Sequence, residues 1–433
     1  MSLVEARPRP ATRRFRLRRS PLWGNPGFLK LWSAQTVSLV GDQVSLLAFP
    51  LIAVLTLHAT PPQVGGLTAA AWAPSVVSPA MGTWIDRRDR HRQMMIAADL
   101  GRAALLTSVP MAAAAGVLTI AQLYVVAFGL GVLSEFFYLA HMSYFPALVE
   151  PRDMVDAQAK LNLSRATADM AGPGFGGVLV QALTAPFAVV ADAVSFLASA
   201  GFLARITTKG LPVSGDEHGH GTARRMAEGF RFLFSQPVLR ASLFSAATLN
   251  FFNFVMWGIL VLYASRTLRL SPGLIGAAFS AGAVGALLGA MAAPRLGRRW
   301  GLGPVTIAGA VLFTVPMALI PLAHGPAGRA ATFLLVGETV ASFGVVLFDI
   351  NLGAVKLVLT PQRVRARSNG AFRAVNYGTR PLGALLGGFL GGAIGLRPTL
   401  WIAVAGGCTA FLWLVFSPIR HIRDLPPSVD REI

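Results

Sequence analysis

The chain has 433 residues, of which 54% are hydrophobic and 13% charged, about half the charged share of a soluble globular protein. The formal net charge of +19 would suggest nucleic-acid binding in a soluble protein, but the basic residues lie between long apolar segments. The composition therefore excludes an ordinary soluble domain, argues against nucleic acid as a partner and predicts an all-α integral membrane protein.

Apolar segments long enough to cross ~30 Å of hydrocarbon as helices recur along the chain. The twelve predicted spans are 28–57, 62–85, 93–116, 120–148, 161–184, 186–206, 238–264, 272–295, 302–323, 329–358, 368–392 and 398–418. One polar stretch separates six spans from six. The predicted regions are a basic N-terminal tail (1–27), a first six-helix bundle (28–206), a linker (207–237), a second six-helix bundle (238–418) and a C-terminal tail (419–433).

The distribution of basic residues predicts the orientation. With the Arg-rich start placed in the cytoplasm, 31 of the 38 Lys and Arg fall in inner segments, four in outer loops and three within spans. This positive-inside bias predicts a multi-pass protein with both termini, the linker and both tails on the cytoplasmic side. The excess of Arg over Lys favours a bacterial source, and hence the inner (plasma) membrane. The first apolar run is too long for a cleaved signal peptide, so we expect it to be retained.

An internal repeat relates the two halves. The stretch 56–70 aligns with 267–281 at a shift of 211 residues without a gap, and Pro61 then matches Pro272 and Gly65 matches Gly276. A second anchor is the pair Gly172-Pro173, which matches Arg380-Pro381. Two six-helix halves in parallel relation are typical of one class of secondary transporter, with the substrate site between the halves near the middle of the bilayer.

The stretch 82–93, GTWIDRRDRHRQ, concentrates charge between the second and third spans. It resembles the loop signature Gly-x-x-x-Asp-Arg-x-Gly-Arg-Arg of the major facilitator superfamily, although Asp89 stands where that family usually has Gly. The resemblance covers about 28–417 and implies twelve transmembrane helices in two pseudo-symmetric bundles. It also implies a clasp that holds the outward-facing state. The clasp residues would be Gly82, Asp86, Arg87, Arg90, Asp99 and Arg102.

Two alternatives to the clasp stay open. The arginines of the loop also enforce topology by themselves, and Asp99 and Arg102, three residues apart, also fit a local ion pair. The second half has Gly297 at the position of the clasp aspartate, so we expect a clasp on one side only.

The string GPGFGG (172–177) fits a dinucleotide-binding pattern, but no strand precedes it. It resembles instead the core of the superfamily's antiporter motif, with Gly172, Pro173, Gly176 and Gly177. The alternative is ordinary packing of small residues between membrane helices. Within the superfamily, the stretch 82–103 resembles the branch of the enterobactin exporter and the macrolide efflux proteins, which implies export of a bulky amphiphile.

Ionisable groups inside a bilayer are costly unless paired or hydrated, so each is a functional candidate. The proton-coupling candidates are Asp42, Glu135, Glu338 and Asp349. The alternative for each is a helix-to-helix hydrogen bond or a permanent ion pair, for example with Arg165 or Arg380. We expect Asp169 and Asp192 to be structural. The resemblance places helices one, four, seven and ten around a central cavity, and the cavity candidates are Ser38, Tyr138, Met142, Asn250, Asn253 and Trp257.

These observations predict a secondary transporter. The absence of a phosphate-binding loop signature argues against direct ATP use. We expect a proton-coupled antiporter that exports drug-like or siderophore-like amphiphilic molecules by alternating access. The alternatives are an importer, a uniporter or a lipid flippase and, more remotely, an enzyme or sensor embedded in the membrane. The expected partners are a small-molecule substrate, protons and membrane lipids, with no cofactor, no metal and a monomeric chain. His218 and His220 in the linker are expected to be solvated.

Overall fold

The computed structural model describes residues 21–86, 88, 90–207 and 222–424. Within these residues the chain forms helices and no strand. The first seven α-helices are α1 Pro26–Leu51, α2 Pro61–Trp72, α3 Ser78–Asp86, α4 His91–Ala114, α5 Ile120–Leu148, α6 Met154–Leu183 and α7 Ala185–Ala204. The others are α8 Thr222–Ser235, α9 Pro237–Leu262, α10 Pro272–Trp300, α11 Leu302–Thr314, α12 Leu319–Leu322, α13 Ala327–Leu359, α14 Gln362–Ala393, α15 Leu396–Cys408 and α16 Ala410–Val415.

The predicted spans correspond to these helices, alone or as consecutive pairs. Eight of the helical segments are long and apolar enough to cross a membrane by length and composition. The second predicted span, 62–85, is not one continuous helix. It is divided into α2 and α3 by a 3₁₀ segment, Ala73–Val77, because Pro74 lacks the amide hydrogen and has a ring that clashes with the preceding turn.

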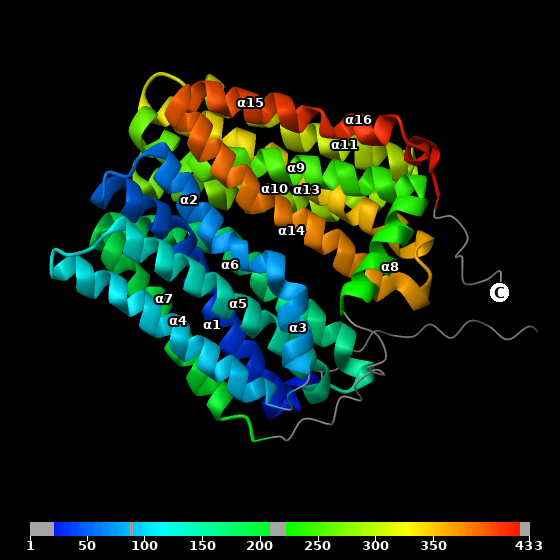
Figure 1. Cartoon of the computed structure of the whole chain (residues 1–433), viewed down its shortest axis with the longest axis horizontal. Helices are drawn as coiled ribbons and strands as arrows, with labels where there is room; N and C mark the ends of the chain where they lie inside the picture. The colour runs from blue at the N-terminus through cyan, green and yellow to red at the C-terminus, as the bar shows by residue number, and fades with distance from the viewer. Residues whose placement is uncertain (1–20, 87, 89, 208–221, 425–433) are drawn as a thin grey trace, which may run out of the picture.

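The helices form two bundles. In the N-terminal bundle α1 packs against α6 and α7, and α4 packs against α5 and α7. In the C-terminal bundle α13 packs against α10 and α11, and α9 packs against α14 and α15. Two helix pairs, α2 with α14 and α6 with α10, make the main contacts between the bundles. Figure 1 shows α2 and α14 side by side between the two groups of helices.

The turns after α1 and α9 show the repeat at atomic detail. A π-helical turn ends each helix, at Ile52–Thr56 and at Tyr263–Thr267. Each is followed by a residue in the left-handed region, His58 with φ 52° and Arg269 with φ 53°. Such a conformation is costly for a residue other than glycine, so its recurrence at a shift of 211 residues confirms the first anchor of the alignment. We call this end of the molecule the short-loop end, and the opposite end, which carries α8 and Asp424, the linker end.

Glycines make both contacts between the bundles, near the short-loop end. A Cβ atom at Gly65 of α2 would stand 2.5 Å from the carbonyl oxygen of Ala384 and 2.7 Å from the Cα atom of Gly388, both on α14. In the same way Gly276 of α10 lies against Pro173 and Gly177 of α6. Close helix approach of this kind requires residues without a side chain.

The paired crossings correct the second anchor of the alignment. Each residue of the first crossing maps onto the second at the shift of 211, so Pro173 corresponds to Ala384 and Gly177 to Gly388. The match of Pro173 with Pro381 was therefore wrong by three residues. The sequence alignment superposed the two prolines, whereas the helix packing superposes the glycines.

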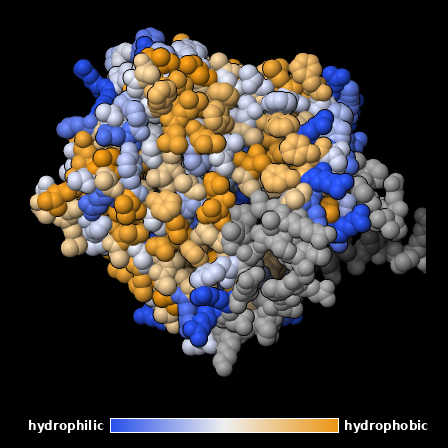
Figure 2. Space-filling view, in the orientation of Figure 1, coloured by the Kyte–Doolittle hydropathy of each residue, from blue (hydrophilic) through white to orange (hydrophobic). Residues whose placement is uncertain are grey.

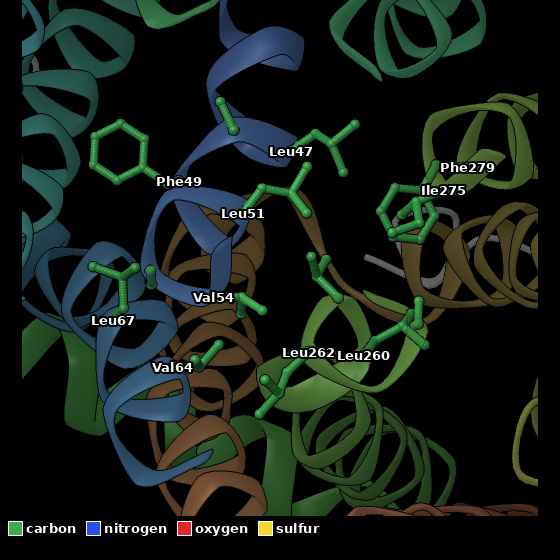
Figure 3. Packing of buried hydrophobic residues seen from close by; sticks show 14 of the residues in the cluster. Leu47, Phe49, Leu51, Val54, Val64, Leu67, Leu260, Leu262, Ile275 and Phe279 are labelled. Carbon is green, nitrogen blue, oxygen red and sulfur yellow. The ribbon is translucent and has the colours of Figure 1, made fainter. Parts of the chain in front are cut away.

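Apolar side chains from both halves seal the short-loop end. Figure 3 shows Leu51 and Val54 of the α1 end, Val64 of α2, Leu262 of α9 and Ile275 of α10 in one cluster. These residues are at most 2% exposed. By contrast, large hydrophobic residues such as Met111, Phe389 and Phe416 are exposed on the outside of the bundles. Figure 2 shows wide apolar areas on the visible face, with hydrophilic residues gathered at its edges.

The predicted linker 207–237 contains a helix that the sequence analysis did not anticipate. The helix α8 packs on α14, with Leu233 2% exposed and Gly229 against the backbone of Arg367. Glu228 and Arg367 form a half-exposed ion pair across this contact. His218 and His220 lie outside the described residues.

Candidate functional site

An ion pair connects the two bundles in the middle of α5. The Nη2 atom of Arg373 on α14 lies 3.6 Å from Oε2 of Glu135 on α5. The guanidinium also lies over the rings of Tyr138 and Tyr377, 4.6 Å and 4.9 Å from their centroids. Oε2 of Glu135 and Nε of Arg373 are buried and have no hydrogen-bond partner. Because buried polar atoms are normally satisfied, the pair has hydrogen-bonding capacity to spare at the interface.

A second arginine lies two turns further along α14, inside a cage of aromatic rings. The guanidinium carbon of Arg380 is 4.5 Å from the ring centroid of Trp72, 5.2 Å from that of Phe254 and 4.0 Å from that of Tyr377. Trp72 comes from α2, so both bundles contribute to the cage. The Nε atom of Arg380 donates a 3.1 Å hydrogen bond to Oδ1 of Asn250 on α9.

Asn250 is held in one orientation. Its amide nitrogen donates to Oδ1 of Asn376 at 2.7 Å and to the carbonyl oxygen of Ala246 at 3.1 Å. The amide oxygen is therefore the atom that faces Arg380. Glu135, Tyr138 and Asn250, predicted from different helices, thus belong to one group together with Arg373, Tyr377, Arg380 and Trp72. We call this group the interface site.

Two other cavity candidates on α9 lie elsewhere, which corrects the predicted single stripe. Asn253 lines a small pocket between α9, α11 and α15, inside the C-terminal bundle. Trp257 stacks on Phe279 of α10, with ring centroids 5.1 Å apart. The spacing of three and four residues places both near Asn250 on a helical projection, but the neighbouring helices divide that surface between the interface and the bundle interior.

Ser38, Met142 and Glu338 do not join the interface site either, whereas Asp349 of α13 lies within the electrostatic influence of Arg380. Ser38 is buried on α1, and Met142 is 50% exposed on α5. On α13, Glu338 is 6% exposed beside Gly282 of α10, whereas Asp349 is exposed. The spacing of eleven residues places these two carboxylates on one side of the helix, but only the first is covered by a neighbouring helix.

Asp42 belongs to an acidic cluster within the N-terminal bundle. It lies within the electrostatic influence of Asp99 and Arg102 on α4 and of Asp192 on α7. Asp192 is 1% exposed and accepts hydrogen bonds from Ser45 of α1 and from Ser195. The cluster therefore places three carboxylates around Arg102, and Arg165 of α6 also lies within the electrostatic influence of Asp42. No Lys or Arg pairs with Asp42 within 4.0 Å in the described part of the chain.

Asp99 and Arg102 form the local pair that was one of the two predicted possibilities. Both are buried, and the guanidinium of Arg102 lies over the rings of Phe137 and Phe196, at 4.6 Å and 4.0 Å. These partners all belong to the N-terminal bundle.

The predicted clasp is only partly visible. Arg87 and the side chain of Asp86 lie outside the described residues. Arg90 is exposed before the first turn of α4. A Cβ atom at Gly82 would meet only Leu139, at an ordinary 3.8 Å, so this glycine does not serve a close helix approach in the observed conformation. Arg88 lies over the ring of Trp84, 3.8 Å from its centroid.

The glycines of the predicted antiporter motif face two helices. Gly172 and Gly176 lie against Gln43 and Val44 of α1, whereas Pro173 and Gly177 lie against α10 of the other bundle. The corresponding glycines of α14, Gly383, Gly387 and Gly388, make the equivalent contacts with α9 and α2. The packing role therefore applies to both halves.

In the described residues no group of three or more His, Cys, Asp or Glu could hold a metal ion.

The sequence analysis missed Arg373, Tyr377 and Arg380 as a unit. Their spacing of four and three residues places them on one face of α14, and this was the signal available. Arg373 was instead counted among the basic residues of the inner segments. Trp72 carried no signal of its own.

A membrane-spanning helical fold with polar groups between two related bundles defines a secondary transporter, and comparisons with known proteins agree. The sequence model of the Major Facilitator Superfamily matches residues 31–337 and 243–431. The multidrug efflux pump Tap of Mycobacterium tuberculosis is 29% identical over 431 residues, which cover 94% of this chain and 96% of Tap.

Solved structures share the fold. A bacterial homologue of the iron transporter ferroportin in its inward-facing state has a TM-score of 0.71 at 16% identity, covering 90% of this chain and 98% of that protein. Its outward-facing state has a TM-score of 0.58 at 17% identity, with the same coverage of both chains. The chain belongs to the Major Facilitator Superfamily. It is a multi-pass membrane transporter and not an enzyme.

Proposed function

We propose that this chain is a proton-coupled antiporter that exports drug-like or siderophore-like amphiphilic molecules, with the linker end in the cytoplasm of a bacterial cell. The observation that carries the proposal is the pair of Glu135 and Arg373, because it joins the two bundles and has unused hydrogen-bonding capacity. The similarity to a multidrug efflux pump over nearly the whole chain supports the export direction.

The chemistry of one carboxylate supplies the coupling. An ionised Glu135 attracts Arg373 and draws α5 towards α14. A proton on Glu135 abolishes this attraction, and a cationic group of a substrate would compete with the proton for the same oxygens. Proton and substrate then exclude each other at one site, which is the minimal requirement of antiport.

The seal at the short-loop end fits the same cycle. Arg380 is four residues from Ala384, where α2 and α14 cross, so the interface site lies on the linker side of the seal. Opening the seal and closing the linker end would transfer the site from one side of the membrane to the other. Both crossings would have to open together, since they join the same two bundles.

The test is substrate-dependent proton flux in liposomes that contain the purified protein and an internal pH dye, with cationic dyes, macrolides and catecholate siderophores as substrates. Glu135→Gln is expected to abolish proton flux while substrate exchange across the membrane continues. Glu338→Gln, which removes a carboxylate outside the interface site, is the matched control and should keep coupling.

Three outcomes would overturn parts of the proposal. Substrate movement without proton flux in the wild type would leave a uniporter or a lipid flippase. Substrate and protons moving in the same direction would indicate a coupled importer. Loss of proton flux in Asp42→Asn, with normal coupling in Glu135→Gln, would move the proton site to the acidic cluster of the N-terminal bundle.

A further inference from the structure

The charges of the interface site are arranged as two poles. Glu135 stands at one, with Arg373 beside it, and Arg380 stands at the other. Arg373 and Arg380 are seven residues apart on α14, which corresponds to about 10 Å along a helix at 1.5 Å per residue. Tyr377 lies between the poles, and both guanidinium groups contact its ring.

The guanidinium at the Arg380 pole has no described carboxylate in direct contact, although Asp349 of α13 and Glu135 of α5 lie within its electrostatic influence. Its described hydrogen-bond partner on α9, Asn250, is neutral, and no carboxylate of the described residues lies within 4.0 Å of its guanidinium. Aromatic rings stabilise a cation by their faces, but they do not neutralise it. A guanidinium donates hydrogen bonds in its own plane, so an anionic group could bind at the edge while Trp72 and Tyr377 cover the faces.

The pole at Glu135 can accept a cationic group without leaving Arg373 devoid of interaction partners. When Glu135 binds another cation, Arg373 keeps its contacts with the rings of Tyr138 and Tyr377. Oε2 of Glu135 has no hydrogen-bond partner at present. The surface between the poles is aromatic, from Tyr138, Tyr377 and Trp72, and suits a flat apolar ring system.

We propose that the substrates of this transporter are zwitterionic aromatic amphiphiles, whose cationic group binds Glu135 and whose anionic group binds Arg380. This inference rests on the proposed function and specifies the substrate class of the same site. A simple lipophilic cation would satisfy the pole at Glu135 but leave the guanidinium of Arg380 buried under its ligand with no anion in direct contact.

A matched pair of dyes tests the inference. Tetramethylrhodamine has a free carboxylate and is zwitterionic at pH 7.5, and its methyl ester has the same ring system but is a cation. Binding of each dye to the full-length protein in detergent is measured by fluorescence anisotropy. The wild type is expected to bind the acid about 10- to 100-fold more tightly than the ester, the contribution of one charge-assisted hydrogen bond.

Three variants test whether Arg380 causes the preference for the acid over the ester. Arg380→Gln is expected to weaken acid binding by about 10- to 100-fold and to leave ester binding within about twofold, so the ester also reports that the variant is folded. Arg380→Lys should keep much of the preference, because it keeps the charge. Arg240→Gln, which removes an exposed arginine on α9, is the matched control and should bind both dyes as the wild type does.

The results that would overturn the inference are specific. A wild type that binds the ester as tightly as the acid refutes it, and so does an Arg380→Gln variant that keeps the preference. If Arg380→Gln binds neither dye, then retention of the preference in Arg380→Lys supports the inference and its loss there refutes it. Proton flux driven by the ester but not by the acid would leave the antiporter standing and remove only the substrate class. Absence of flux with every substrate tested would remove the antiporter itself.

Discussion

The crossing of α2 and α14 predicts what one methyl group does to the conformational equilibrium. In Gly388→Ala the new Cβ atom would stand 2.8 Å from the carbonyl oxygen of Pro61, 3.0 Å from the Cα atom of Gly65 and 3.2 Å from the Cα atom of Pro62. Carbon atoms pack at about 3.5–4.0 Å, so the helices must separate by roughly 0.5–1 Å. Overpacking of this kind costs about 1–3 kcal/mol.

The cost of overpacking falls only on the conformation in which the short-loop end is closed. The gain in helix propensity from Gly to Ala acts equally in the closed and open states, because α14 is helical in both, and it cancels. The ratio of closed to open short-loop ends should therefore fall by about 5- to 150-fold, at 1.4 kcal/mol for each factor of ten. Gly370→Ala on the same helix is the matched control, because its Cβ atom would meet nothing within 4 Å.

The assay is a distance measurement by pulsed electron paramagnetic resonance. Spin labels at Val117 and Leu322, exposed near the short-loop ends of the two bundles, are introduced as cysteines after Cys408→Ser. The longer-distance population should grow in Gly388→Ala and not in Gly370→Ala. Identical distance distributions in the two variants would refute the reasoning that the glycine crossing holds this end closed.

Three further outcomes follow from the packing and charges described. Gly276→Ala, at the symmetric crossing, should open the same end, and an effect confined to one of the two crossings would contradict the expectation that both hold this end closed. Arg102→Met leaves Asp99 as a buried, unpaired carboxylate and should lower the free energy of unfolding by about 3–5 kcal/mol. The double variant Asp99→Asn, Arg102→Met should recover part of this loss, as measured by thermal unfolding. A double variant no more stable than Arg102→Met would show that the unpaired Asp99 carboxylate is not the source of the lost stability. Leu233→Ala should cost about 2–5 kcal/mol of local packing and expose the linker to protease. Arg367→Gln, at the half-exposed pair with Glu228, should cost at most about 1 kcal/mol. If Arg367→Gln were the more destabilising of the two, apolar burial would not be what holds α8 on α14.

The sequence predicted the helices well where apolar length alone decides them. The spans match the observed helices closely, and the repeat at 211 residues was correct for the turns after α1 and α9. The break at Pro74 was missed because the apolar run continues through the proline. The helix α8 was missed because the polar residues before Thr222 dominated the interpretation of the whole linker, although Phe230 and Leu233 have helical spacing.

The interface site was predicted in part because some of its chemistry is rare and some is common. An intramembrane carboxylate such as Glu135 stands out in any sequence, and so does a polar residue such as Asn250. Arg373 did not, because an arginine near the predicted end of a span resembles an ordinary topology signal. Asn253 and Trp257 were misplaced because the rotation of α9 about its axis depends on which neighbours cover each side, and spacing along one helix does not contain that information.

The glycine crossings are duplicated, whereas the chemistry between the bundles occurs once. At the shift of 211 residues, Asn162 corresponds to Arg373 and Val346 corresponds to Glu135, so the ion pair has no counterpart in the other half. Substitutions at the interface site therefore leave the glycines of both crossings unchanged, so the substrate site can diverge while the contact between the bundles is kept. The residues that set the substrate can therefore change while the same four glycines, Gly65, Gly177, Gly276 and Gly388, keep the two halves in contact.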